Sequence, residues 1–445
     1  MCGILGSIGQ FNNINNNSFH QALLKSNFRG PDYSNSHNFI SSNNQIFLGH
    51  NRLSIIDLNP TGNQPKESRS KNNMIIFNGE IYNHLELRKK FPSDFAWTSN
   101  SDTETLIELI EKFGTIKTLS LIRGMFAFAV YDFKKDVVTL ARDISGEKPL
   151  YLYFHEKGFI FSSDLNSPSH LGMPSKEIDQ TAINQLLKFN YIPAPLCIYK
   201  STFKLPAASC ISIDLKKFQH KSANSFNDLI GSAGIEFQKF WSLPEQREQF
   251  NGSSSASELT KKTEQLLEES IQMQQLSDVP IGAFLSGGID SSLVVALMQK
   301  NANSKIKTFN IGFDFDGYDE SPYAEKIAKH LGTDHSSTKC TKAEAVKIIQ
   351  SLPSAFAEPF ADSSQIPTML VSKIAKEQVS VVLSGDGGDE LLGGYNRYLL
   401  SSGYWKKLRL IPAPIRKKIF YILSKYSIKQ STYVLKYLFP TMLSG

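Results

Sequence analysis

The chain has 445 residues, of which 41% are hydrophobic and 20% are charged, a composition typical of globular proteins. Because a single core stops growing near roughly 250 to 300 residues, we expect two or three domains. Collagen, coiled coils and disulfide-rich secreted proteins are excluded, and no run of about 18 apolar residues predicts a membrane span. The four cysteines, Cys2, Cys197, Cys210 and Cys340, have no CxxC spacing, which disfavours a zinc site.

The first residues lack the basic segment of a signal peptide, so we expect the protein to stay in the cytoplasm, where its cysteines remain thiols. The net charge is +6. Residues 391–445 contain 10 Lys and Arg and no Asp or Glu, so the rest of the chain carries a net −4. The body of the protein therefore gives no reason to expect a nucleic-acid partner.

The first third of the chain is predicted to be rich in β-strands. Short apolar runs at 45–48, 74–77, 126–131 and 159–161 are separated by Asn, Gly, Ser and Asp, which favours packed antiparallel sheets. The asparagine-rich segment 12–17 is expected to be a surface loop. Polar stretches at 218–234 and near 251–255 predict a linker at 216–255, between domains at 2–215 and 256–445.

The remainder predicts alternating strands and helices. Residues 280–285, 307–313 and 379–383 are expected to be strands, and 291–300 and 321–332 helices, with Ser321 as N-cap and Pro322 at the first helical position. This alternation predicts a doubly wound parallel α/β sheet. In such sheets ligands bind beyond the carboxyl ends of the strands, where both glycine-rich loops of this half lie.

Cys2 is the first candidate catalytic residue. Removal of Met1, which a small second side chain permits, would make Cys2 the N-terminal residue. Its free α-amine, with an ordinary pKa of about 7.7 to 8, could take the proton of the thiol and later protonate a leaving amine. We expect Cys2 to attack a carboxamide, form a thioester and release ammonia. A buried apolar cysteine in the first strand is the alternative.

Four motifs follow Cys2 in order: Arg29-Gly30-Pro31-Asp32, Gly49 to Ile55 (GHNRLSI), Phe77 to Asn83 (FNGEIYN) and Ser101-Asp102-Thr103-Glu104. Over residues 2 to about 170, they resemble the class II, N-terminal-nucleophile glutamine amidotransferase domain. The resemblance implies an αββα fold with an oxyanion hole from Asn78 and Gly79. It also implies a glutamine site in which Arg52 binds the α-carboxylate and Glu80 and Asp102 contact the α-amino end, with Leu53, Ser54, Ile55 and Ile56 beside them. An Asn-Gly hairpin turn and surface ion pairs are the structural alternatives.

A glycine-rich loop, Ser286 to Ser292 (SGGIDSS), follows a predicted strand and opens a predicted helix, a place where backbone N–H groups can hold phosphate. It lacks the ending of a Walker A loop, which disfavours γ-phosphate transfer. It resembles the pyrophosphate loop of ATP pyrophosphatases, which cleave ATP between the α- and β-phosphates. The resemblance implies an ATP site made by Leu285, Ser286, Gly287, Gly288, Asp290, Ser291, Ile311, Ser384 and Gly385.

A second loop, Leu383 to Glu390 (LSGDGGDE), crowds three carboxylates among glycines. Such crowding is unfavourable unless a cation or a polar substrate neutralises it. We therefore expect Mg²⁺ at this loop, held by Asp290 and Asp389 and bridging the departing diphosphate. A solvated acidic turn is the alternative.

A glutaminase joined to a pyrophosphate-loop synthetase resembles the glutamine-hydrolysing asparagine synthetases over residues 2 to about 400. The resemblance implies conversion of L-aspartate, ATP and L-glutamine to L-asparagine, AMP, diphosphate and L-glutamate, with ammonia passing through an internal tunnel to a β-aspartyl-AMP. Asp386, the implied aid to ammonia attack, stands where the family commonly has Glu. The synthetase domain of that family also normally continues further, so we expect it to be truncated here.

Three functions are therefore open: asparagine synthesis, amidation of another carboxylate such as a uronic-acid sugar, and a synthetase-dead protein that binds partners or only hydrolyses glutamine. The expected partners are small molecules, namely glutamine, ATP and the carboxylate, and a homodimer is left open.

The basic tail contains a segment, 414–426, whose spacing predicts a helix with Ile415, Ile419, Ile422 and Tyr426 on one stripe. One interpretation is a helix that binds an anionic membrane surface. The preferred interpretation is the start of a further helical subdomain whose apolar stripe lacks its partners. It predicts exposed Ile419 and Ile422 and a tendency to self-associate.

Overall fold

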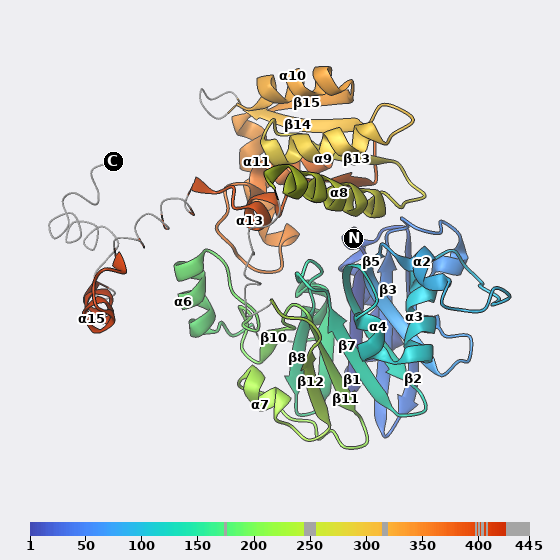
Figure 1. Cartoon of the computed structure of the whole chain (residues 1–445). Helices are drawn as coiled ribbons and strands as arrows, with labels where there is room; N and C mark the ends of the chain where they lie inside the picture. The colour runs from blue at the N-terminus through green and yellow to red at the C-terminus, as the bar shows by residue number, and fades with distance from the viewer. Residues whose placement is uncertain are drawn as a thin grey trace.

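A computed structural model describes residues 1–172, 176–243, 255–313, 319–396, 398, 401, 405 and 408–423, apart from the side chains of 422 and 423. The chain forms an N-terminal unit (residues 1–243) and a C-terminal unit (from residue 255), which lie against each other (Figure 1). Within the described ranges, no helix has the length and apolar character needed to cross a bilayer.

Two six-stranded antiparallel sheets form the middle of the N-terminal unit. The first contains, in spatial order, β10 (Thr202–Lys204), β8 (Tyr151–His155), β9 (Gly158–Ser162), β1 (Gly3–Gly9), β3 (Asn44–Arg52) and β2 (Tyr33–Ser41). The second contains β12 (Ile235–Lys239), β11 (Ser209–Asp214), β7 (Val137–Arg142), β6 (Gly124–Asp132), β5 (Asn73–Ile81) and β4 (Lys66–Glu67). All four predicted apolar runs lie in these strands.

The packing of this unit follows from the two-residue period of its strands, which sends alternate side chains to opposite faces. Ile4, Ile46, Met74, Ile76 and Leu140, from both sheets, meet in the central core. The outer face of the first sheet packs against α1 (Asn16–Leu24) and that of the second against α3 (Asp102–Phe113). The αββα fold is therefore confirmed.

Shorter elements complete the unit: η1 (Asn27–Arg29), η2 (Pro60–Gly62), α2 (His84–Arg88), α4 (Thr115–Leu119), α5 (Asn166–Ser169), α6 (Gln180–Phe189) and α7 (Phe226–Ile230). The asparagine-rich segment is only in part the expected loop, because the side chain of Asn15 accepts a hydrogen bond from the amide of Ser18 and caps α1. The predicted linker also differs from the structure. β12 pairs with β11, so residues 226–239 extend the N-terminal unit, and 244–254 lie outside the described residues.

The C-terminal unit is a parallel sheet in the order β15 (Asp334–Cys340), β14 (Lys307–Phe313), β13 (Ile281–Phe284) and β16 (Val381–Leu383). One face packs against α8 (Ala256–Gln274), α9 (Ile289–Lys300) and α10 (Ser321–Leu331), and the other against α11 (Lys342–Ala355) and α12 (Gln365–Ala375). The doubly wound fold is confirmed. Glu320, one residue before the predicted Ser321, is the N-cap of α10.

Strand β15 was not expected, because its sequence, DHSSTKC, is almost entirely polar. In the part of the chain that the structure describes, it lies at the edge of the sheet with no strand on its outer side, so polar side chains can meet water there. Beyond β16 follow α13 (Gly388–Leu392) and α15 (Ala413–Leu423), and α15 lies apart from all three sheets in Figure 1.

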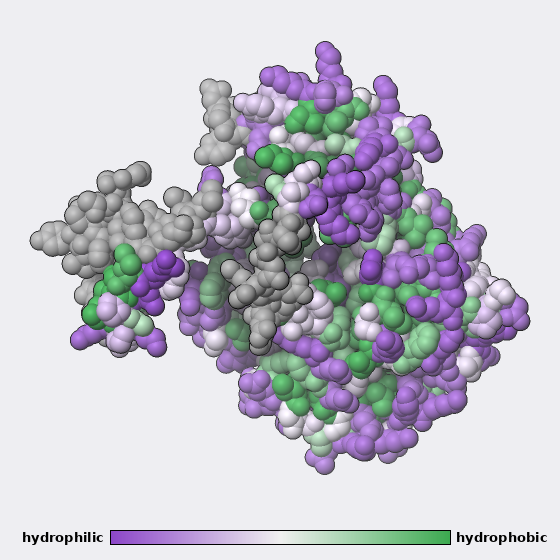
Figure 2. All heavy atoms as spheres, viewed as in Figure 1, coloured by the Kyte–Doolittle hydropathy of each residue, from purple (hydrophilic) through white to green (hydrophobic). Residues whose placement is uncertain are grey.

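Helix α15 confirms the helix predicted in the tail but not all of its exposed stripe. Ile415 is 54% exposed, whereas Ile419 is half-buried, so its expected exposure is wrong. Arg416, one turn before Ile419, lies over the Trp405 ring at 4.7 Å, and residues three apart share a helix face. Figure 2 shows apolar and charged residues side by side on this helix. The side chain of Ile422, and Tyr426, lie outside the described residues.

Candidate active site

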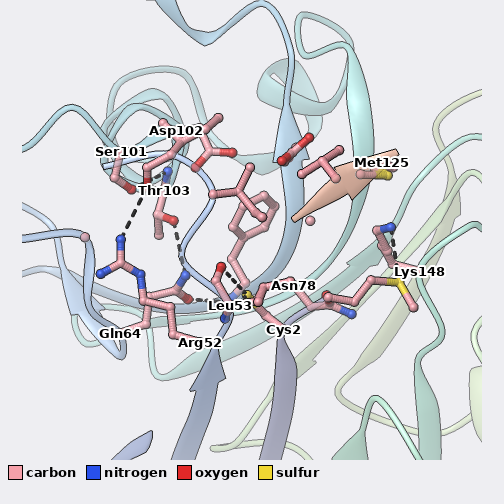
Figure 3. Close-up of a pocket in the computed structure, with 18 of the residues that line it drawn as sticks. Cys2, Arg52, Leu53, Gln64, Asn78, Ser101, Asp102, Thr103, Met125 and Lys148 are labelled. Atoms are coloured by element: carbon pink, nitrogen blue, oxygen red, sulfur yellow. Dashed lines mark hydrogen bonds between the residues drawn. The ribbon is translucent and has the colours of Figure 1, made fainter. Parts of the chain in front are cut away.

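A cavity of about 290 Å³ lies where β1, β3 and β5 of the N-terminal unit approach β16 of the C-terminal unit (Figure 3). It brings together the predicted residues Cys2, Arg52, Leu53, Ile55, Ile56, Asn78, Gly79, Glu80 and Asp102. Ser54 is the exception. It does not line the cavity, and its amide donates a hydrogen bond of 2.7 Å to Asp32 Oδ2.

Cys2 stands directly before β1 and faces the segment that follows β3. The amide of Leu53 donates a hydrogen bond to Cys2 Sγ at 3.4 Å, and the Arg29 side chain donates to the Cys2 carbonyl at 3.1 Å. Burial raises the pKa of the Cys2 thiol, while burial lowers the pKa of the Met1 amine beside it to about 6. The Met1 amine is therefore largely unprotonated at neutral pH.

Asn78 and Gly79 lie inside β5 and pair with Ala127 and Phe126 of β6, so the alternative of a hairpin turn is wrong. A Cβ on Gly79 would lie 2.1 Å from the carbonyl oxygen of Met125, so no side chain fits there. Among the described residues, Asn78 Oδ1 is buried without a hydrogen-bond partner, and Nδ2 reaches Ser163 Oγ alone, at 3.5 Å. The Asn78 amide group is therefore available to a ligand.

Arg52 is buried and is oriented by the loop that follows it. Its guanidinium donates to the carbonyl oxygens of Ile56, Asp57 and Asn59 and to the side chain of Asn63. The alternative of a surface ion pair is therefore wrong for Arg52. A planar guanidinium fixed in this way at a cavity wall suits a carboxylate.

Glu80 and Asp102 form an acidic wall. Burial, followed by repulsion from Asp102, raises the pKa of Glu80 to about 7. Burial also raises the pKa of Asp102 to about 6, although the amide of Ile81 donates to its carboxylate at 2.9 Å. Two desolvated carboxylates with raised pKa values are suited to binding a cation such as an ammonium group.

Several lining residues were not predicted from the sequence: Gln64, Ser101, Thr103, Met125, Lys148, Ser380, Val381 and Val382. Gln64 Oε1 accepts from the amide of Phe77 at 2.7 Å, and Gln64 Nε2 donates to Thr103 Oγ1 at 3.2 Å. Lys148 is buried, its pKa is lowered by that burial, and it lies near Glu80. Charged residues follow closely on the end of β7, between Arg142 and Lys148, and this pattern in the sequence could have identified Lys148 as a candidate site residue. No local sequence pattern marks Gln64 or Ser380.

The two glycine-rich loops of the C-terminal unit meet at the carboxyl ends of β13 and β16. Gly287 has a φ of +86°, and Gly288 caps α9. Ser286 Oγ and Ser291 Oγ lie 2.9 Å apart. The sheet order reverses between these two strands, which is where ligands bind in such folds.

The acidic residues of the second loop approach the first. A Cβ on Gly388 would lie 2.6 Å from Asp290 Cγ, and one on Gly385 would lie 2.6 Å from the Ser291 nitrogen. Asp386 Oδ2 accepts from Ser384 Oγ at 2.9 Å, and Asp389 belongs to α13. Within the described ranges, no group of three or more His, Cys, Asp or Glu side chains could hold a metal ion.

Two predicted adenosine-site residues lie in the cores on either side of the sheet. Leu285 is 1% exposed and packs toward α9, and Ile311 is buried and packs toward α12. A ligand could reach these positions chiefly through their backbone.

Comparison with known proteins gives consistent matches. Residues 1–224 match the family model of the glutamine amidotransferase domain, and 262–438 match that of asparagine synthase. A protein of Methanocaldococcus jannaschii named "putative asparagine synthetase (glutamine-hydrolyzing) 2" is 33% identical over 97% of this chain and 84% of its own length. Asparagine synthetase (glutamine-hydrolyzing) 1 of Bacillus subtilis is 32% identical over 88% and 58%. Amidase chry2 of Gibberella zeae is 26% identical over 84% and 54%. The matched part of this chain thus covers less than two thirds of the length of the Bacillus subtilis and Gibberella zeae proteins.

Proposed function

The chain belongs to the glutamine-hydrolysing asparagine synthetase family, and on that premise we propose that it uses ATP to transfer the amide nitrogen of glutamine to a carboxylate. One observation carries the proposal. Cys2, an oriented Arg52, the open amide of Asn78 and the Glu80–Asp102 wall surround a single cavity, and one side of that cavity is the strand that leads to the second glycine-rich loop.

The first half-reaction takes place at Cys2. After Met1 is removed, the α-amine of Cys2 accepts the thiol proton, and the thiolate attacks the glutamine carboxamide. Asn78 and the amide of Gly79 stabilise the oxyanion, while Arg52 holds the α-carboxylate and Glu80 and Asp102 hold the α-ammonium. The protonated amine then donates to the leaving nitrogen, which departs as ammonia. Water hydrolyses the thioester to glutamate and restores the thiol.

The second half-reaction takes place between the two glycine-rich loops. The acceptor carboxylate attacks the α-phosphorus of ATP and displaces diphosphate, and ammonia then displaces AMP from the acyl-adenylate to form the amide. Ser286 to Ser291 hold the phosphates through backbone N–H groups. Asp386 takes the proton released when ammonia attacks.

We propose that Mg²⁺ binds at these loops, held by Asp290 and Asp389. The Asp290 carboxylate lies beside the backbone of Gly388, the residue before Asp389. Mg²⁺ commonly uses one or two carboxylates together with substrate phosphates and water, so a larger protein cluster is not needed. Bound there, it would neutralise the charge on the departing diphosphate.

We propose L-aspartate as the acceptor, by similarity to the relatives named asparagine synthetase. Asp386 in place of Glu, and a relative named as an amidase, favour keeping a different carboxylate, such as a uronic-acid sugar, as the second candidate. The cytoplasmic location and the homodimer remain predictions.

The test is to incubate the purified chain with ATP, Mg²⁺, glutamine and one acid at a time, and to measure diphosphate, glutamate and amidated product. Diphosphate that appears with aspartate and glutamine, together with asparagine, is the expected result. Diphosphate with a uronic-acid sugar alone would identify the second candidate. Glutamate without acid-dependent diphosphate would leave glutamine hydrolysis as the activity, and no product of either kind would refute the proposal.

A further inference from the structure

The loop that orients Arg52 is itself held by the C-terminal unit. Asp278, between α8 and β13, contacts this loop at two points on either side of Ile56. Its amide donates to the carbonyl oxygen of Ile55 at 3.0 Å, and its carboxylate Oδ2 accepts from the amide of Asp57 at 2.7 Å. A single residue of one unit thus pairs with the backbone of the other through a donor and an acceptor.

The backbone that Asp278 contacts also supplies hydrogen-bond acceptors that orient the Arg52 guanidinium. The carbonyl oxygens of Ile56 and Asp57 both accept from Arg52 Nη2, and Ile55 and Ile56 line the cavity. Asp57 is buried, and its own carboxylate accepts from the amides of Asn59 and Asn100 and from Thr61 Oγ1. The loop is therefore braced inside the N-terminal unit at Asp57 and depends on Asp278 at residues 55–57.

Asp278 is in turn fixed within its own unit. Ser277 Oγ hydrogen-bonds both the amide and the carbonyl of Val279 at 3.1 Å, which shapes the turn. The next carbonyl, of Pro280, accepts from the amide of Ser380 at 3.1 Å, at the start of β16. The contact point is thus tied to two neighbouring strands of the parallel sheet, β13 and β16.

We propose that Asp278 is a positioning residue for glutamine: it holds residues 55–57 so that the Arg52 guanidinium faces the α-carboxylate of the substrate. The inference rests on the proposed glutaminase function. It means that the glutamine site is complete only when the C-terminal unit is docked. Without the carboxylate of Asp278, the amide of Asp57 loses its acceptor, and the carbonyls that orient Arg52 are free to rotate.

The test uses the full-length chain and its Asp278→Ala and Asp278→Asn variants. We expect Asp278→Ala to raise the KM for glutamine roughly 5- to 30-fold, the factor that one or two kcal/mol of lost hydrogen bonding represents, with kcat changed far less. Asp278→Asn keeps an acceptor oxygen and should stay near the parental KM. Asp228→Ala, which removes an exposed carboxylate from α7, is the matched control and should leave KM unchanged.

A second readout separates recognition from thiol chemistry. The diazoketone 6-diazo-5-oxo-L-norleucine carries the α-amino and α-carboxyl groups of glutamine and alkylates Cys2, whereas iodoacetamide carries neither group. Labelling by the diazoketone should slow in Asp278→Ala by the same roughly 5- to 30-fold factor, and labelling by iodoacetamide should not.

The proposal is overturned if Asp278→Ala keeps the parental KM, if Asp278→Asn is as defective as Asp278→Ala, or if both reagents slow equally, since equal slowing would indicate a general loss of structure. Amide hydrogen exchange of residues 53–63 is measured in parallel. If the parental chain hydrolyses no glutamine, the proposed function fails. If the amide hydrogen exchange of residues 53–63 is then unchanged in Asp278→Ala, the positioning role is overturned independently of activity. Faster exchange of these amides would support the role of Asp278 in holding the loop.

Discussion

The proposed glutaminase half-reaction assigns the nucleophile to Cys2, whose thiol shares the cavity with Asn78 and the Glu80–Asp102 wall. We expect Cys2→Ala to lower glutamate release by roughly a thousandfold or more, the scale on which loss of a nucleophile acts. Diphosphate release driven by added ammonium chloride should persist, because that chemistry lies in the other unit. Cys2→Ser, which preserves the volume of the side chain, controls for packing. Glutamate release that survives in Cys2→Ala would contradict the assignment.

The acidic wall predicts a pH dependence of glutamine binding. The pKa of Glu80 is about 7 and that of Asp102 about 6, so both are ionised only above neutrality. An ammonium group is attracted by the ionised forms, so the affinity for glutamine should be greatest near pH 8 and should fall as pH drops through 7 and 6, by up to about tenfold per pH unit for each carboxylate. Calorimetry on the Cys2→Ala protein measures this binding without turnover.

Glu80→Gln provides the control for that pH dependence. This variant should bind glutamine more weakly at pH 8, and its affinity should begin to fall only near pH 6, where Asp102 alone titrates. An affinity that is constant or rises toward pH 5.5 in the parental site would show that the two carboxylates do not face the α-ammonium group.

Among the elements, the segment between α11 and α12 joins the two units through a buried ion pair. Glu358 accepts from Lys204 Nζ, with both side chains at most 13% exposed, and Glu358 also accepts from the amide of Ile198 at 2.7 Å. Lys204→Met should leave a buried carboxylate without its cation and lower the free energy of unfolding by about 3 kcal/mol. Urea denaturation measures the change.

Lys200→Met is the matched control for this pair. Lys200 pairs with Glu177, but both side chains are solvent-exposed, so the denaturation midpoint should barely move. The double variant Lys204→Met, Glu358→Leu should regain part of the stability, because it removes the stranded charge. If Lys204→Met and Lys200→Met behaved alike, the interdomain pair would contribute little.

The contact between the two glycine-rich loops predicts a separate loss of synthetase activity. The added methyl group of Gly385→Ala would lie 2.6 Å from the Ser291 nitrogen, so one loop must shift. Displacement of catalytic groups by about 1 Å commonly lowers rates by about 100-fold, so acid-dependent diphosphate release should fall by at least about tenfold. Glutamate release should be retained. Gly231→Ala is the control, since its added carbon would contact only the Asn227 carbonyl oxygen, at 3.3 Å. Unchanged diphosphate release in Gly385→Ala would remove this loop from the nucleotide site.

At the scale of the whole molecule, the two interpretations of the basic tail can be separated by lipid binding. A membrane-surface helix should bind anionic vesicles, whereas the start of a further helical subdomain should not. Arg416 lies on the Trp405 ring and Ile419 is half-buried, so part of the basic, apolar surface of this helix is already covered, in part by the tail segment that precedes it. We therefore expect the full chain not to float with vesicles of anionic phospholipid at physiological salt. Flotation that disappears in high salt, and in a chain lacking residues 404–445, would instead support a membrane-surface helix.

The chemistry of the site could be predicted from the sequence because it lies in short segments. Cys2, the FNGEIYN motif and the two glycine-rich loops each lie in or next to the strand or helix end that presents them. Apolar runs predicted the antiparallel sheets and the doubly wound unit, whereas the αββα layering came from the family resemblance. The predictions missed strands whose sequences are largely polar and therefore show no apolar run. β12 and the edge strand β15 are only half apolar or less, so their pairing depends on a neighbour rather than on their own pattern.

Only the tertiary structure decided which distant residues share a site. Gln64, Lys148, Ser380 and Asp278 reach the cavity or its loop across separations of dozens to hundreds of residues, through backbone hydrogen bonds and burial that leave no periodic signal. The physical reason is that local propensity acts over a few residues, whereas docking of the two units is selected by the packing of complete surfaces. The sequence alone therefore determined which reactive groups are present, and the tertiary structure determined which residues of the two units line one cavity.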